Sequence, residues 1–307
     1  MSSSPESNSQ LQSPLADRPD GPRRRRSAGV VTPGGARLRA LREQAGRAQL
    51  WVEAEADLGT GYLQRVESGR VAQPSRVTVE RILAALDARY SERREILELF
   101  GYVVATPLPT DEEIAWARAS CQHELHDVPF PAYVLDCLPR LLTWNRHVPR
   151  LLGYGPDEPA GQRTLERLVG QPLLAAWLDP AAPFGRLVAE PEVFLPLLIR
   201  VLRYEYQRLP DAPWIAGALA DLSQRLPRFR EAWEQTAQSS DPISASRVLA
   251  PVKLNVDGAG LLQFRLVAEP FVRDSRFRLI YFVPADPKTM RQCAAWASDL
   301  PPTDDDA

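Results

Sequence analysis

Two adjacent side chains, Gln64 and Arg65, have the chemistry to read DNA bases and lie in a segment with a helix-turn-helix pattern. Glutamine can bridge two polar atoms of adenine, and arginine can bridge two acceptors of guanine, in the major groove. Apolar residues around them recur with the spacing of two short helices that meet at a turn, which predicts that both side chains point away from a buried face. The residues that we expect to face bases are Thr60, Gly61, Gln64 and Arg65.

The neighbouring residues extend this pattern. Gln49 begins the preceding predicted helix, where its amide and the free backbone N–H groups can hold a phosphate. The run Tyr62-Leu63…Val66-Glu67-Ser68-Gly69-Arg70, the pair Pro74-Ser75 and the apolar positions Val79, Ile82, Leu83 and Leu86 follow. With these residues the segment resembles the Xre/Cro-repressor family of helix-turn-helix domains. The resemblance implies specific binding of double-stranded DNA, with Gln49, Arg70 and Ser75 facing phosphates and a structural role for Glu67.

The segment departs from the family pattern at three positions. Asp57 stands where a turn glycine is common, Gly59 replaces the usual Ser/Thr cap, and Glu53 replaces a small residue. Glycine is tolerated at a cap, at a cost of only a few tenths of a kcal/mol. The alternative interpretation is a helical protein-interaction module without DNA contact. We favour DNA binding, because packing alone does not explain Gln49, Gln64 and Arg65.

The second half of the chain changes from a helical to a strand-like period. A hairpin-like stretch covers Ala132 to Asn145, a helical block covers 164–235, and three strand-like runs follow at 249–256, 261–269 and 277–283. Asp257-Gly258 between the first two runs is a strong hairpin signal. We therefore predict an α+β domain with one antiparallel sheet covered on one side by helices, after an all-α helix-turn-helix domain of four to five helices.

This second half resembles the MmyB-like, PAS-like ligand-binding domain that often follows such a helix-turn-helix. The resemblance is carried by Ala132-Tyr133-Val134-Leu135-Asp136…Leu142-Thr143-Trp144-Asn145, by Leu222-Ser223…Pro227-Arg228-Phe229-Arg230…Trp233 and by the last two strands. It implies an apolar cavity and a fatty-acid-like effector. Arg203, Arg228 and Arg230 could anchor a carboxylate, or could be solvated helix-face charges. The candidate pocket residues are Tyr133, Leu135, Leu142, Trp144, Phe194, Leu198, Leu202, Tyr206, Phe264, Leu266 and Phe282.

Length and composition set the boundaries of these domains. The chain has 307 residues, a net charge of −2 and three cysteines without close pair spacing, and it shows no signal or membrane-spanning pattern, so we expect a cytoplasmic protein. We expect a disordered tail at 1–33, the helix-turn-helix domain at 34–105, the ligand-binding domain at 111–300 and an acidic tail at 301–307. The run Arg23–Arg26 is either solvated or a basic arm that touches DNA.

Other chemistry has little support in the sequence. The cluster Cys121-Gln122-His123-Glu124-Leu125-His126, with Cys137 after it, is the best metal candidate, but a second ligand pair with finger-like spacing is missing. No phosphate-binding loop or nucleophile elbow is present. We therefore predict no enzyme, no metal and no required cofactor, but a homodimeric regulator with a small apolar effector. The alternative is a ligand-sensing interaction module that no longer binds DNA.

Overall fold

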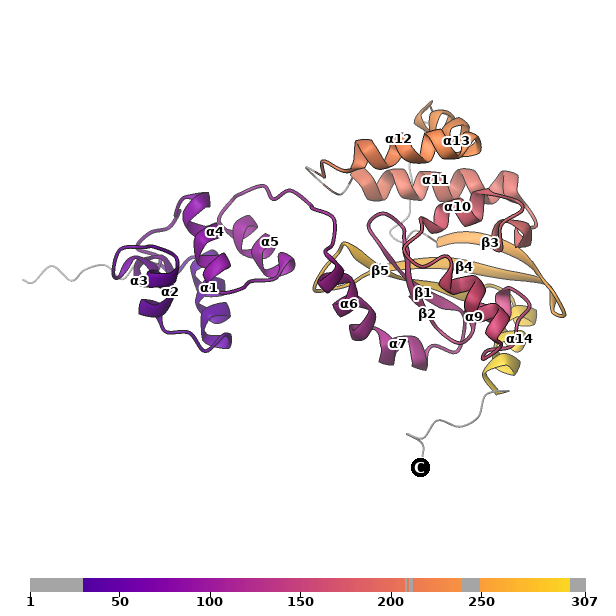
Figure 1. Cartoon of the computed structure of the whole chain (residues 1–307), viewed down its shortest axis with the longest axis horizontal. Coiled ribbons are helices and arrows are strands. Elements are labelled where there is room, and N and C mark those ends of the chain that lie inside the picture. The colour runs from indigo at the N-terminus through magenta and orange to yellow at the C-terminus, as the bar shows by residue number, and fades with distance from the viewer. Residues whose placement is uncertain (1–29, 208, 210–211, 239–248, 299–307) are drawn as a thin grey trace, which may run out of the picture. The chain divides into compact units, whose positions relative to one another are not determined.

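The chain divides into two compact units, Met1–Ile82 and Leu83–Ala307 (Figure 1). The computed structural model describes residues 30–207, 209, 212–238 and 249–298. The predicted acidic tail, most of the predicted N-terminal tail and the run Arg23–Arg26 lie outside the described residues.

The first unit is helical and has a continuous apolar core. Thr32 caps the first helix by accepting a hydrogen bond from the Gly35 backbone at 3.1 Å, and Pro33 fits the first helical position because that position needs no N–H donor. A side chain at Gly35 would meet the carbonyl oxygen of Val66 at 2.5 Å, so this glycine allows the first helix to approach the third. The helices are α1 (Pro33–Gln44), α2 (Gln49–Glu55), α3 (Tyr62–Glu67) and α4 (Arg76–Ala85), of which the last extends into the second unit. Leu38, Val52, Leu63, Val66, Val79 and Ile82 are completely buried.

The second unit is built on a five-stranded antiparallel sheet of order β2-β1-β5-β4-β3. This sheet confirms the predicted hairpin at 132–145 and the three strands predicted near the end of the chain. A short loop after Val256, with Gly258 at a positive φ of 78°, joins the third strand to the fourth, as the Asp-Gly signal predicts. The strands are β1 (Ala132–Asp136), β2 (Leu141–Trp144), β3 (Leu249–Val256), β4 (Gly260–Pro270) and β5 (Phe277–Pro284).

Helices cover both faces of this sheet, whereas we predicted one covered face (Figure 1). Successive side chains of a strand point to opposite faces, and β1 and β5 are apolar at nearly every position, so both faces need cover. Val134 and Leu279 pack on the face covered by α6 (Asp111–Ser120) and α7 (Gln122–Asp127). Tyr133 and Ile280 pack on the opposite face, under α10 (Leu173–Leu178) and α11 (Pro191–Gln207). Of two further helices, α13 (Pro227–Gln238) packs against α11 and α12 (Ile215–Arg225) packs against α13, and one apolar cluster joins all three.

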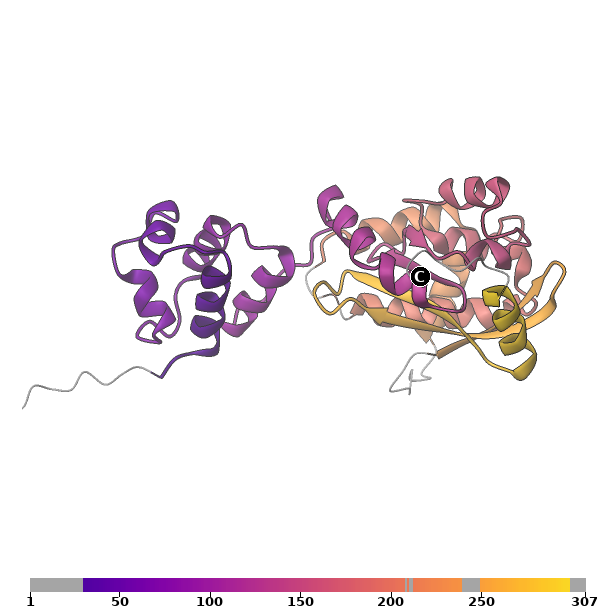
Figure 2. The same ribbon diagram turned by 90° about the horizontal axis from the view of Figure 1, so that it is seen from below.

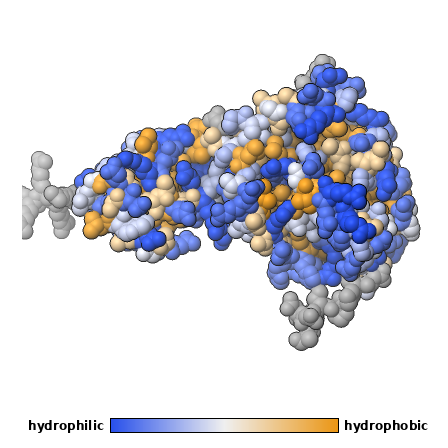
Figure 3. Space-filling model, in the orientation of Figure 1, coloured by the Kyte–Doolittle hydropathy of each residue, from blue (hydrophilic) through white to orange (hydrophobic). Residues whose placement is uncertain are grey.

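The remaining elements complete the second unit. They are α5 (Tyr90–Leu99), α8 (Val148–Leu151), α9 (Pro159–Glu166), a 3-10 turn at Gly185–Leu187 and α14 (Pro287–Ser298). Figure 2 shows α14 beside the sheet, where the Thr289 hydroxyl accepts a hydrogen bond from the Gln263 backbone. On the face seen in Figure 3, hydrophilic residues dominate and apolar residues form small groups between them. No helix in the described part of the chain is long and apolar enough to cross a membrane.

A buried arginine ties the start of β5 to other elements of the second unit. The Arg276 side chain is 1% exposed and forms ion pairs with Asp274 at 2.7 Å and with Glu113 of α6 at 2.6 Å. Its guanidinium lies 3.8 Å from the ring centroid of Tyr90, the first residue of α5. The buried charge is therefore paired with carboxylates and stacked on an aromatic ring, as a buried arginine requires.

His147, just after β2, is buried in its neutral form. Its side chain has no hydrogen-bond partner for Nδ1 among the described residues, and burial lowers the pKa of the imidazole to about 4, helped by the neighbouring Arg146 and Arg150 charges. An unfolded histidine has a pKa near 6.5. Between these two values the unfolded chain binds a proton that the folded chain does not bind, so folding stability falls as the pH falls.

We expect His147→Leu to remove this part of the pH dependence. Between about pH 6.5 and 4, the difference in unfolding free energy between the unchanged protein and the variant should change by up to about 3 kcal/mol. Urea unfolding followed by tryptophan fluorescence at a series of pH values measures this difference. The control His123→Leu changes a side chain that is 90% exposed and should keep the original slope. Equal slopes for all three proteins would contradict a neutral buried His147.

Candidate DNA-reading helix and ligand cavity

The N-terminus of α3 is capped by a carboxylate from the preceding helix. Gly61 precedes α3 with a positive φ of 76° and offers no side chain. Glu53 of α2 is buried and accepts hydrogen bonds from the backbone N–H groups of Gly61 at 2.9 Å and Leu63 at 2.8 Å. An anion at this end also meets the positive end of the helix dipole. The cap position of α3 is Gly61, not Gly59 as expected from the sequence, and Glu53 replaces the hydrogen bond of a Ser/Thr cap.

The predicted base-reading residues lie together at the start of this helix. Gln64 and Arg65 are exposed on its first turns, and Thr60 and the half-buried Gly61 lie in the turn before it. The Arg65 guanidinium lies 5.5 Å from the ring centroid of Tyr62. An exposed amide and an exposed guanidinium side by side are chemically suited to base edges, and their role stays a prediction.

The predicted phosphate-binding residues differ in whether their side chains already form hydrogen bonds within the protein. The Gln49 amide donates to Glu67 at 2.6 Å, and Glu67 is buried and also accepts from Arg42 at 2.7 Å. Glu67 therefore joins α1, α2 and α3, which fits the structural role implied by the resemblance. The Ser75 hydroxyl accepts from the Thr78 backbone at the start of α4. Arg70 is exposed beyond the end of α3.

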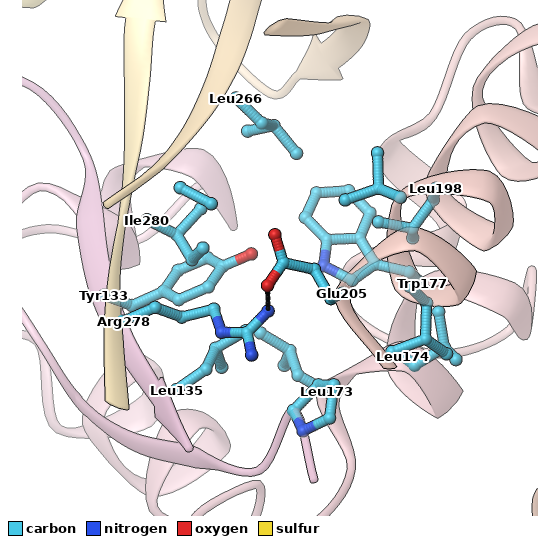
Figure 4. Close-up of a pocket in the computed structure, with 14 residues that line it drawn as sticks. Tyr133, Leu135, Leu173, Leu174, Trp177, Leu198, Glu205, Leu266, Arg278 and Ile280 are labelled. Atoms are coloured by element: carbon cyan, nitrogen blue, oxygen red, sulfur yellow. Dashed lines mark ion pairs between the residues drawn. The ribbon is translucent and has the colours of Figure 1, made fainter. Parts of the chain in front are cut away.

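The second unit has a partly open apolar cavity of about 90 Å³ between the sheet and two helices (Figure 4). Strands β1, β4 and β5 form its floor, and α10 and α11 cover it. Aliphatic side chains form most of the wall, which is the usual character of a small-molecule site. The lining residues are Tyr133, Leu135, Pro139, Leu173, Leu174, Trp177, Leu198, Val201, Leu202, Glu205, Leu266, Ala268, Arg278 and Ile280.

The structure sorts the predicted pocket residues into two groups. Tyr133, Leu135, Leu198, Leu202 and Leu266 line the cavity. The other six do not line it. Leu142 packs on the opposite face of the sheet; Phe194, Phe264 and Phe282 are close-packed core with Trp144 against them; and Tyr206 belongs to the cluster under α12 and α13. Aromatic residues at core spacing cannot be separated from cavity residues by sequence pattern, because both are apolar and buried.

Sequence reasoning missed the residues that α10 and β5 bring to the cavity. Leu173, Leu174 and Trp177 come from a helix of only six residues, too short for a clear period. Only Arg278 could have been identified as a candidate cavity residue from the sequence, because it is a charged residue inside an otherwise apolar strand. Buried charges of this kind are rare unless they are paired, and they often mark a functional site.

The charged groups of the cavity are Arg278 and Glu205, not the arginines considered from sequence. Arg278 Nη1 lies 3.0 Å from Glu205 Oε2 (Figure 4). Arg203 instead donates to the Trp233 carbonyl oxygen and stacks on its ring, and Arg228 and Arg230 are exposed on α13. The Arg278–Glu205 pair was not predicted because it depends on the strand register of β5 and on the packing of α11 on the sheet.

The other polar groups of this region are neutral. Burial raises the pKa of the Tyr133 hydroxyl well above its usual range, an effect that the neighbouring Trp177 side chain only partly offsets. Burial also raises the pKa of the nearby Cys137 thiol to about 12. A thiol is a poor nucleophile while it is protonated. The cavity therefore has the chemistry of a binding site with one ion pair.

The predicted metal candidate forms no cluster. Cys121 is buried and donates to the Arg118 carbonyl oxygen, and burial raises the pKa of its thiol to about 11. His126 contacts Arg146, and His123 is exposed. Among the described residues no group of three potential ligands could hold a metal ion.

A helix-turn-helix followed by a domain with an internal apolar cavity defines a class of ligand-sensing transcription regulators. The model of the MmyB-like transcription regulator ligand binding domain matches residues 117–295, and that of a helix-turn-helix domain matches residues 35–96. The first match alone covers more than half of the chain, so the chain belongs to the family of MmyB-like transcription regulators. No curated protein matches the sequence.

We expect Glu53→Ala to loosen α3. The backbone N–H groups of Gly61 and Leu63 would lose a charged acceptor, at a cost of about 2 kcal/mol, so amide hydrogen exchange at the start of α3 should become about 30-fold faster. Glu53→Gln, which keeps an acceptor oxygen, should recover part of the protection. The matched control Glu55→Ala changes an exposed residue of the same helix and should leave the exchange rates unchanged. If Glu53→Ala behaves like this control, the carboxylate is not the cap.

Proposed function

We propose that this regulator binds specific double-stranded DNA through α3 and responds to a small apolar, fatty-acid-like ligand in the cavity of the second unit. The observation that carries the proposal is the cavity itself. It lies inside the domain whose family is named for ligand binding, its walls are apolar, and its charges form a single ion pair. An amphiphile with a short polar head matches such a site.

The DNA-binding part of the proposal rests on the exposed start of α3. Gln64 and Arg65 stand next to each other on a helix whose opposite face, with Leu63 and Val66, is completely buried. The Glu53 cap fixes the turn that presents them. Such regulators commonly bind two half-sites as a symmetric dimer, and we propose a homodimer here.

The response to ligand would come from the helices that cover the cavity. A volume of about 90 Å³ is several times smaller than a typical pocket for a drug-sized ligand, which is about 300 to 1,000 Å³. A longer ligand therefore extends out of the partly open cavity or moves α10 or α11 away from the sheet. A ligand that binds one arrangement better than the other shifts the population toward it, and DNA affinity can change with that population.

We expect Arg65→Ala and Arg70→Ala to weaken DNA binding in different ways. Arg65→Ala should cost about 1 to 3 kcal/mol on the cognate site and relax the sequence preference, whereas Arg70→Ala should weaken binding to all sequences and flatten the salt dependence. Electrophoretic mobility shift with DNA from upstream of its own coding region, beside random DNA, measures both effects. Equal losses on both DNAs for both variants would contradict this division of roles. A folded protein without any selective shift at low salt would instead favour the interaction-module alternative.

Filling the cavity should abolish the ligand response and leave DNA binding intact. We expect Leu198→Trp, which places a larger side chain in the cavity, to prevent decanoate from changing DNA affinity. The control Val193→Trp adds the same side chain at an exposed position of α11. The measurement is the mobility shift with and without decanoate. An unchanged decanoate response in Leu198→Trp would show that the cavity is not the effector site.

A further inference from the structure

The two charged residues of the cavity, Arg278 and Glu205, differ in burial and in how their backbone is held. Arg278 lies on β5, the middle strand of the sheet, where it is paired with Leu135 on one side and Pro270 on the other. Its side chain is 8% exposed. Glu205 lies in the last turn of α11, and its side chain is 23% exposed. A rotation about its side-chain bonds can therefore carry the carboxylate toward water, whereas Arg278 is more deeply buried and its backbone is held on both sides by the sheet.

Glu205 is the one carboxylate among the residues that line the cavity. Two other buried carboxylates of the second unit are already paired. Asp136 accepts from Arg140 Nε at 2.6 Å and from the Leu138 backbone, and Asp274 is paired with Arg276. Within the described residues, Arg278 pairs with Glu205 alone. An unpaired buried cation is costly, so Glu205 can leave only when another anion arrives.

Figure 4 shows the Arg278–Glu205 pair among the apolar lining residues, with Leu266 and Leu198 on one side of it and Leu135 and Leu173 on the other. The carboxylate of Glu205 is drawn next to the hydroxyl of Tyr133. A ligand with an acidic head and an apolar tail fits this arrangement of groups. A carboxylate can accept two parallel hydrogen bonds from a guanidinium, which a neutral head group cannot match in strength.

We propose that Glu205 is an internal competitor for the ligand: an acidic amphiphile binds by taking Arg278 from Glu205, which turns toward solvent. This inference rests on the proposed function, since it takes the cavity to be the effector site. It identifies the ligand as a carboxylate and Glu205 as the residue that sets how much of it is needed. A cationic amphiphile would have to displace Arg278 instead, and the sheet opposes that exchange.

The test compares decanoate, decanol and decylammonium on the full-length protein by isothermal titration calorimetry. Decanoate should bind more tightly than the other two. Glu205→Gln should raise the affinity for decanoate by about tenfold, equivalent to about 1.4 kcal/mol, because a neutral amide competes less strongly for Arg278. It should leave the affinity for decanol unchanged. The control Glu192→Gln makes the same change at an exposed position of α11 and should have no effect. Glu205→Gln keeps the shape of the side chain and an acceptor oxygen, so the fold should persist, as circular dichroism can verify.

The other outcomes separate this inference from the proposed function. If decanoate and decanol bind equally and Glu205→Gln changes neither affinity, the ion pair is structural, and the cavity can still be an effector site. If decylammonium binds best and Glu205→Gln abolishes its binding, the site is cationic and the inference is wrong. If none of the three probes binds, both the inference and the ligand part of the proposed function are overturned.

Discussion

The second unit depends on the position of β5 in the middle of an antiparallel sheet. Its backbone is paired with β1 on one side and with β4 on the other, so its register fixes both neighbours. Side chains then alternate strictly between the two faces. Phe277 and Leu279 pack under α6 and α7, whereas Arg278 and Ile280 face the cavity. A shift of one residue would place a charge in the first cluster and an aromatic ring in the cavity, so the hydrophobic pattern strongly specifies this register.

Two buried cations lie close together in sequence at the beginning of β5. Arg276 directly precedes the strand and Arg278 is its second residue. Arg278 meets Glu205 in the cavity, and Arg276 meets Asp274, Glu113 and the ring of Tyr90 at the start of α5. The cavity and α5 are therefore connected through a single stretch of backbone within the second unit.

Local sequence patterns predicted most helices and strands of the fold. They did not predict the side-chain contacts between residues that are far apart in the sequence. The helix-turn-helix and the three late strands follow from apolar periodicity and from the Asp257-Gly258 turn, which are properties of neighbouring residues. The Glu53 cap joins α2 and α3 across the turn between them. In the sequence, Glu53 only stood out as a departure from the helix-turn-helix family pattern. Arg278 and Glu205 are far apart along the chain, so only the sheet register and the helix packing reveal their pairing. For the same reason, sequence could not separate cavity residues such as Leu266 from core residues such as Phe264.

Two of the buried ion pairs among the described residues, Arg42–Glu67 and Arg278–Glu205, show what makes such a pair permanent or exchangeable. In the first unit, Glu67 accepts from Arg42 and also from Gln49, and its side chain is almost completely buried. Removing either donor would leave a buried carboxylate short of partners, so this arrangement holds three helices together at a fixed geometry. In the second unit, Glu205 has Arg278 as its one ion-pair partner among the described residues, and its side chain remains partly exposed to solvent. Water can replace the protein around Glu205 but not around Glu67. The Arg42–Glu67 pair is therefore suited to fix the geometry of three helices. The Arg278–Glu205 pair is suited to break when another anion binds Arg278.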